Sequence, residues 1–277
     1  MGVAEEFLEN GYKFTKEQNQ EQKVYILDLA SEMLRYKRAK NKIEKKEYVQ
    51  DLMTILKQRS QINIKSNYPV EKPARPLDGH KTSRLQFLAD EDSFLISFKP
   101  SFHDIYDIEK GFIEGAYINF FDLALRYEHG GNLKFEKFDI VNISSYAPRE
   151  TFFKLLSWEI LFGFERNFKD EMQFQLKGGA GYSYQSFGFL YYLFLNPAVY
   201  IWDDVSVSLS PKFGIIKNFS NFKIGATVYR EFFSYGDEIT QVEFFSTYNV
   251  YKDISLNLKY DITGHEEKAS VSLFYYF

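Results

Sequence analysis

Residues 172–184 read Met-Gln-Phe-Gln-Leu-Lys-Gly-Gly-Ala-Gly-Tyr-Ser-Tyr, an alternation of apolar and polar positions. Successive side chains of a β-strand point to opposite faces, so this stretch predicts a strand with one apolar and one polar face. The same period of two recurs in residues 158–164, 205–215 and 254–260. These segments therefore predict antiparallel β structure.

Residues 82–277 carry the period throughout and predict about twelve strands of roughly ten residues joined by tight turns. In one of them, Leu133 and Phe135 share one parity and Phe138 and Ile140 the other, which predicts a β-bulge. Residues 187–195 are apolar on both faces. The expected strands are 82–89, 93–102, 115–127, 132–142, 155–166, 171–184, 187–201, 205–217, 221–232, 239–250, 253–262 and 268–277.

A soluble β-sandwich and a transmembrane β-barrel share this alternation. Aromatic residues near strand ends, within a chain of 29 Phe and 21 Tyr, are typical of the aromatic girdles of a barrel. Charges of both signs in mid-strand suit a polar, filled lumen with little free bore. These lumen positions are Lys99, Glu159, Glu165, Lys177, Lys212, Glu243 and Lys259.

The C-terminus also favours the barrel over a sandwich strand that happens to end in Phe. Leu273, Tyr275 and Phe277 share one parity, and the sequence stops on that Phe. This ending resembles the membrane-insertion signal that the barrel-assembly machinery reads on bacterial outer-membrane proteins. We therefore predict a mainly β fold, an antiparallel transmembrane barrel of about 12 strands surrounded by outer-membrane lipid.

Residues 1–62 are helical and polar, and a Pro-rich linker follows at 63–81. Helices over 21–42 and 43–60 are predicted to form a hairpin, which we expect in the periplasm. A basic run over residues 35–42 is either a solvated face or a contact for an anionic membrane or partner. The first residues lack a signal-peptide pattern, so we expect a cytosolic chain or a mature piece of a longer one. The positions expected to face inward are Val24, Leu27, Ala30, Leu34, Tyr48, Leu52, Ile55 and Leu56.

Composition excludes several functions. The formal net charge of −4 argues against a nucleic-acid binder, and the absence of Cys excludes disulfides, thiolate metal sites and a Cys nucleophile. The four His show no metal-ligand spacing, and the run Gly178–Gly181 sits in a strand pattern rather than before a helix. We expect no metal, no cofactor and no catalytic residue in this chain.

A series of short segments resembles the C-terminal portion of the Lnb-N-terminal-periplasmic-domain proteins, a bacterial envelope family of largely unknown function. That resemblance implies a periplasmic hydrolase-like domain of Cys/His character, a helical segment and a barrel-like domain. This chain lacks the hydrolase-like domain and any Cys, so no catalytic residue carries over, and it reads as a fragment, a split gene product or a short member. The matching segments are 79–85, 100–107, 111–112, 115–116, 122–127, 138–141, 147–149 and 157–158.

Outer-membrane barrels keep both termini in the periplasm, which places segments 103–114 and 143–154 on the periplasmic rim. We expect a polar cluster there, beneath the barrel, that faces the helices. Its alternative role is a set of caps and salt bridges that closes the barrel floor. The candidate members are His80, Arg84, His103, Asp104, Asp107 and Arg149.

Three functions remain open at this stage. The first is an outer-membrane anchor or scaffold for a periplasmic, hydrolase-like module in the Gram-negative envelope. The second is an outer-membrane enzyme that modifies or hydrolyses lipids, for which no well-spaced Ser/His pair is visible. The third is a narrow channel, which the charged lumen positions disfavour.

Overall fold

The computed structural model describes residues 2–67, 72, 74–150, 153–167 and 170–277, in two compact units, Met1–Lys72 and Pro73–Phe277. The boundary falls inside the predicted linker, of which residues 68–71 and 73 lie outside the described part. A 3₁₀ turn, η1 (Pro76–Asp78), leads into the second unit.

The first unit holds α1 (Gly2–Glu9), α2 (Gln20–Ala39) and α3 (Lys45–Ser60). The short α1 is an addition to the two helices expected from the sequence. Asn19 fixes the start of α2, because its side chain accepts from the Gln22 backbone N–H while the Gln22 side chain accepts from the Asn19 backbone. None of the described helices is both long and apolar enough to cross a bilayer.

The apolar stripe of α2 is buried as expected, with Val24, Leu27, Ala30 and Leu34 in the core of the unit. On α3 only Ile55 is buried, and Leu56, expected to face inward, leaves 42% of its surface exposed. The expectation for Leu56 was wrong because one residue along a helix turns the side chain about 100° away from the buried position.

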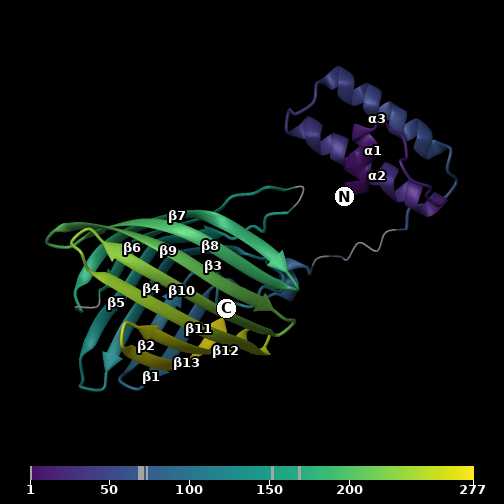
Figure 1. Ribbon diagram of the computed structural model, residues 1–277. Helices are drawn as coiled ribbons and strands as arrows, with labels where there is room; N and C mark the ends of the chain where they lie inside the picture. The colour runs from purple at the N-terminus through teal and green to yellow at the C-terminus, as the bar shows by residue number, and fades with distance from the viewer. Residues whose placement is uncertain (1, 68–71, 73, 151–152, 168–169) are drawn as a thin grey trace. The chain divides into compact units, whose positions relative to one another are not determined.

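The second unit is a closed antiparallel barrel (Figure 1). β2 and β3 are separated only by Pro100 and both pair with β4, so they act as one strand, and β13 pairs back onto β1 to close twelve strands. The predicted fold is confirmed, and no strand end differs from its expected position by more than three residues. The strands are β1 (Arg84–Asp90), β2 (Ser93–Lys99), β3 (Ser101–His103), β4 (Ala116–Glu128), β5 (Leu133–Ser145), β6 (Ser157–Arg166), β7 (Met172–Ser186), β8 (Phe189–Ile201), β9 (Val205–Asn218), β10 (Phe222–Phe233), β11 (Glu238–Tyr251), β12 (Ile254–Thr263) and β13 (Glu266–Tyr276).

The parity change in β5 corresponds to irregular pairing on both of its sides. The register shifts between Ala124 and Leu125 on the β4 side and between Asp139 and Val141 on the β5 side facing β6. An extra residue at each point moves the following side chains to the other face, which keeps the apolar ones outside.

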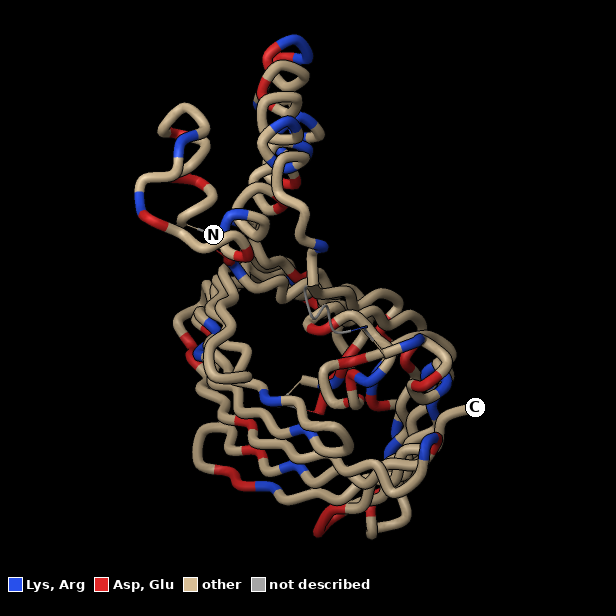
Figure 2. The backbone as a smooth tube through the Cα atoms, turned by 90° about the vertical axis from the view of Figure 1, so that its right-hand side faces the viewer, with Lys and Arg blue, Asp and Glu red and all other residues tan. Residues whose placement is uncertain are grey.

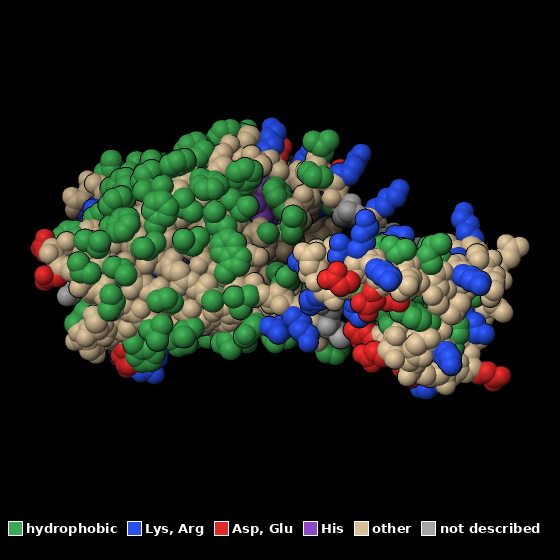
Figure 3. All heavy atoms as spheres, turned by 90° about the horizontal axis from the view of Figure 1, so that it is seen from above, with side chains coloured by type: hydrophobic (Ala, Val, Ile, Leu, Met, Phe, Trp, Pro, Cys, Tyr) green, Lys and Arg blue, Asp and Glu red, His purple; other side chains and the backbone are tan. Residues whose placement is uncertain are grey.

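Apolar side chains cover the outside of the barrel (Figure 3), whereas polar side chains such as Gln175, Ser183 and Asn257 are buried inside. This is the reverse of a soluble sandwich and is the arrangement that lipid requires. The predicted insertion residues Leu273 and Tyr275 of β13, and Phe277 directly after it, face outward, while Phe274 and Tyr276 are buried in the interior.

We call the end where β1 begins and β13 ends the rim end, and residues 104–115, which follow β3 there, the plug. The rim half of the lumen is filled by an aromatic core against which Ile105 and Tyr106 of the plug pack. This core explains why residues 187–195 are apolar on both faces: the outward positions of β8 meet lipid and the inward positions meet the core. Its members are Tyr117, Tyr146, Leu190, Tyr192, Phe194, Ile216 and Phe245.

Candidate functional site

An ion network holds the plug inside the rim end, where Figure 2 shows charged residues within the ring of strands. Three barrel cations, Arg84 of β1, Lys99 of β2 and Lys223 of β10, meet three plug carboxylates, Asp104, Asp107 and Glu109. All six are buried. We call these six residues the rim network, and its formal charges balance.

Asp107 is the centre of the rim network. Its Oδ1 accepts from Arg84 at 2.6 Å and from the Tyr276 hydroxyl at 2.8 Å. Its Oδ2 accepts from Lys99 at 2.9 Å and from the Asp104 backbone N–H at 2.9 Å. One carboxylate offers about four lone-pair positions, so these four bonds leave Asp107 no further acceptor position.

The electrostatics favour the ionised state of the plug carboxylates. Burial alone would raise the pKa of Asp107, but Arg84 and Lys99 outweigh it and hold that pKa well below its usual range. Burial would also raise the pKa of Asp104 and of Glu109. Arg84 outweighs burial at Asp104 and Lys223 outweighs it at Glu109, so both pKa values are lowered. The network therefore stays charged at neutral pH.

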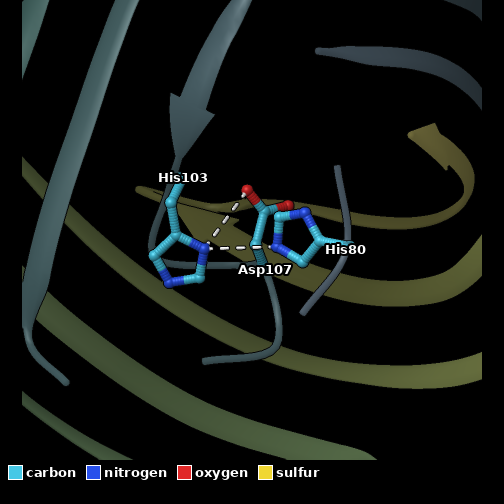
Figure 4. A group of neighbouring side chains, drawn as sticks. All are labelled: His80, His103 and Asp107. Atoms are coloured by element: carbon cyan, nitrogen blue, oxygen red, sulfur yellow. Dashed lines mark hydrogen bonds and ion pairs between the residues drawn. The ribbon is translucent and has the colours of Figure 1, made fainter. Parts of the chain in front are cut away.

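Two histidines lie beside Asp107 (Figure 4). The carbonyl of Lys81 accepts from His80 Nδ1 at 2.6 Å, so His80 Nε2 carries the lone pair and accepts from His103 Nδ1 at 3.3 Å. Phe112 stacks on both rings, with centroid distances of 4.6 Å to His80 and 4.3 Å to His103. Burial lowers the pKa of His80, so both its donor and its acceptor bond belong to a neutral imidazole.

His80, His103 and Asp107 also place one potential ligand atom each within 4.8 Å of one another. They nevertheless do not suit a divalent metal ion. The Asp107 oxygens already hold four donors, and two of those donors are the cations Arg84 and Lys99, which would repel a bound metal. The trio is better described as part of the packing around the rim network.

The structure brings together five of the six residues expected at the rim: His80, Arg84, His103, Asp104 and Asp107. The cluster lies inside the barrel end, not beneath it, because the plug folds back between the strands. Arg149 lies elsewhere. Its backbone N–H donates to the Ser183 carbonyl at 2.6 Å, and its guanidinium lies 4.8 Å from the centre of the Tyr182 ring.

The sequence did not single out Lys223, Glu109 or Tyr276 for this site. Lys223 and Tyr276 hold inward positions at the rim ends of their strands, so position in the strand is a signal for both. Lys99 was expected only as a lumen residue. Of the other charged lumen positions, Glu159, Glu165, Lys177, Lys212, Glu243 and Lys259 all line the interior, as predicted.

Comparison with known families matches residues 73–277 to a family described as a domain of unknown function (DUF7840). The chain belongs to this family. Residues 2–70 match a second domain of unknown function (DUF7842). No curated protein matches the chain.

Solved structures with a similar fold are outer-membrane barrels. The KdgM porin in complex with disordered oligogalacturonate has 11% sequence identity and a TM-score of 0.44, with 71% of this chain and 99% of that chain covered. The NanC porin has 8% identity and a TM-score of 0.43, with coverages of 70% and 98%. A loop-deletion mutant of OmpT from Vibrio cholerae has 8% identity and a TM-score of 0.32, with coverages of 72% and 97%.

Proposed function

We propose that this outer-membrane barrel anchors or scaffolds a periplasmic, hydrolase-like module in the Gram-negative envelope. The observation that carries the proposal is the packed rim end. A barrel whose rim half is filled by an aromatic core and a buried ion network is suited to holding something at the membrane rather than to passing solutes.

The connectivity supports the same role. Arg84 at the start of β1 is the register partner of Tyr276 at the end of β13, so the chain enters and leaves the barrel at the rim end. Outer-membrane barrels place that end in the periplasm. The helical unit, which precedes the barrel in the chain, is then a periplasmic segment available to a hydrolase-like domain such as the family resemblance implies.

The two alternatives find less support. A channel would need a passage through the plug, where Lys99, Asp107 and Lys223 are fully buried. A lipid-modifying enzyme would need a nucleophile beside a base on the lipid-facing wall. His80 and His103 are instead buried together in the lumen, and Ser83 donates to the carbonyl of Pro100 at 2.8 Å.

The anchoring role can be tested with the purified full chain in detergent and a separately expressed hydrolase-like domain from a longer relative. We expect the domain to be retained by the immobilised chain and not by an unrelated eight-stranded barrel in the same detergent. Planar-bilayer recordings should remain silent. Equal retention on both barrels, or steady conductance through the full chain, would overturn the proposal.

A further inference from the structure

A polar cavity of about 520 Å³ occupies the lumen beyond the plug. Its floor includes Asp104 and Tyr106 of the plug, and its wall extends to Glu136, Glu165 and Glu231 near the other ends of β5, β6 and β10. Because the rim end is packed, the cavity is a blind pocket that opens away from the rim. Its volume is in the range that holds a small organic ligand.

The lining is acidic. Eight carboxylates and five basic side chains face the cavity, a formal excess of three negative charges. Arg126 and Asp261, which flank the lining and pair with Glu136 and Lys259, carry opposite charges and leave the excess unchanged. A low-dielectric wall around such an excess attracts cations.

Buried oxygen atoms without a hydrogen-bond partner also favour a ligand that donates hydrogen bonds. Asp139 is 98% buried, and its Oδ1 has no hydrogen-bond partner in the described structure, while its Oδ2 pairs with Lys137 at 3.2 Å. Asn119 Oδ1, Glu136 Oε2 and Asn196 Oδ1 are also buried without a partner in the described structure. All four are acceptors that line the cavity; the one fully buried, unpartnered donor among the described lining residues is Arg84 Nε, whose guanidinium lies over the Phe274 ring. Among these buried atoms, acceptors without a donor therefore outnumber donors without an acceptor.

Unlike Asp139, two carboxylates of the lining have no ion-pair partner among the described residues. Glu165, on the strand next to Asp139, accepts from Gln175 at 2.6 Å, and Glu231 accepts from the hydroxyls of Tyr200 and Ser208. Lys177 belongs to β7, which pairs with β6 and β8. Its Nζ lies 5.4 Å from the centre of the Tyr200 ring. Asp139, Glu165 and Glu231 lie around Lys177, but their oxygens do not converge within the 4.8 Å that a shared small ion would need.

We propose that this cavity binds an organic cation that carries several spaced ammonium groups. Spaced N–H donors would reach Asp139, Glu165 and Glu231 in turn, whereas a single metal ion would need converging ligands. Among the described residues only His80, His103 and Asp107 converge so closely, and they lie in the plug region. This binding is independent of the anchoring role.

The test uses the full chain, folded in a neutral detergent at low ionic strength, and isothermal titration calorimetry with spermidine. We expect saturable binding that weakens as salt rises. The variants D139N and E165Q should each raise the Kd about tenfold, the factor expected when one charge-assisted hydrogen bond is lost. E165Q breaks no ion pair, so it guards against a folding defect in D139N, and heat-modifiable gel migration reports the fold of each variant.

E238Q is the matched control, because Glu238 lies in an exposed pair with Arg230 and outside the cavity lining. It removes the same charge and should leave the Kd unchanged. Mg²⁺ and maltotriose serve as competing probes. The proposal is wrong if spermidine does not bind, if E238Q weakens binding as much as E165Q does, or if maltotriose or Mg²⁺ binds in a D139N-sensitive way while spermidine does not.

Discussion

The Lys223 ammonium of β10 lies 2.8 Å from Glu109 Oε1 and 3.0 Å from the Asp107 backbone carbonyl oxygen. Arg84 holds the same short segment from β1, and β11, β12 and β13 separate these two strands around the barrel. Lys223 and Arg84 therefore fasten one segment of the plug to two well-separated parts of the wall.

Loss of the central carboxylate should destabilise the barrel strongly. In D107N, Arg84 and Lys99 would remain buried without their shared counter-charge, and breaking a buried pair in this way costs about 3–5 kcal/mol. Urea unfolding of the lipid-reconstituted protein measures this. The matched change E238Q removes a carboxylate from an exposed pair and should cost no more than about 0.5 kcal/mol. Equal unfolding midpoints for the two variants would contradict the assigned role of Asp107.

Acidification should destabilise the rim end in two stages. Burial lowers the pKa of His80, which faces Asp107, Lys99 and Arg84, and lowers that of His103 to about 3. Below about pH 6.5 the unfolded chain therefore takes up two protons that the folded chain resists. Stability is therefore complete above that pH and falls as the pH drops towards the folded pKa values, by up to about 1.4 kcal/mol per pH unit for each histidine. The depressed pKa of Asp107 adds a second loss below about pH 4.

The variant H80Q isolates the His80 share of the first stage, because Gln offers a donor and an acceptor without titrating and His103 is left in place. Thermal unfolding midpoints measured between pH 7.5 and 5 should decline less in H80Q than in the unchanged protein. A decline of the same steepness in both proteins would assign the pH dependence to other groups.

Metal ions should leave stability unchanged. Because Asp107 is already bonded to four donors, neither EDTA nor equimolar Zn²⁺ is expected to shift the thermal unfolding midpoint. Differential scanning calorimetry checks this with H80Q as the comparison. A stabilisation by Zn²⁺ that disappears in H80Q would show that the trio is a metal site after all.

Gly214 should not tolerate a side chain. A Cβ at this position would lie 2.2 Å from the Tyr192 hydroxyl oxygen, and Tyr192 is held in place by a 2.6 Å hydrogen bond to Thr227. G214A should therefore cost about 1–3 kcal/mol by overpacking. Gly178 provides the control, since a Cβ there meets nothing within 4 Å. If G178A proves as destabilising as G214A in urea unfolding, the aromatic core is not packed as described.

The last residue should matter for membrane insertion rather than for folded stability. Phe277 and Phe232 face outward to a similar extent, with 46% and 44% of their surfaces exposed. We expect F277S to reduce the amount of protein recovered in outer-membrane fractions several-fold, and F232S to have little effect. Equal recovery of the two variants would remove the assigned role of the C-terminal strand as an insertion signal.

The strands were predictable because lipid outside and polar side chains inside impose a period of two that needs no tertiary information. The interior was harder. The sequence showed residues 187–195 to be apolar on both faces but gave no reason for it. Phe194 and Tyr192 lie on the inward face of β8 because the plug brings its own apolar side chains Ile105 and Tyr106 into the lumen. Pattern along one strand does not reveal what packs against it from another part of the chain.

The rim site was predictable only in part for the same reason. Topology alone gathers five of its residues, because two lie at the start of β1 and three at the end of β3, and both strand ends are at the rim end. These residues are His80, Arg84, His103, Asp104 and Asp107. Lys223 reaches them only through barrel closure, since it is far along the chain. Arg149 was expected in the cluster but lies away from it, because backbone pairing with Ser183 holds it against the barrel wall.

The hydrogen bond from Tyr276 to Asp107 connects the last strand of the barrel to the plug. Arg84 belongs to the first strand made and Tyr276 to the last, they sit opposite each other where the sheet closes, and one carboxylate oxygen binds both. The closing strand pair and the plug are therefore held together through the same carboxylate oxygen. A polypeptide truncated by two residues would lose Tyr276, and with it the only one of these contacts that comes from the last strand.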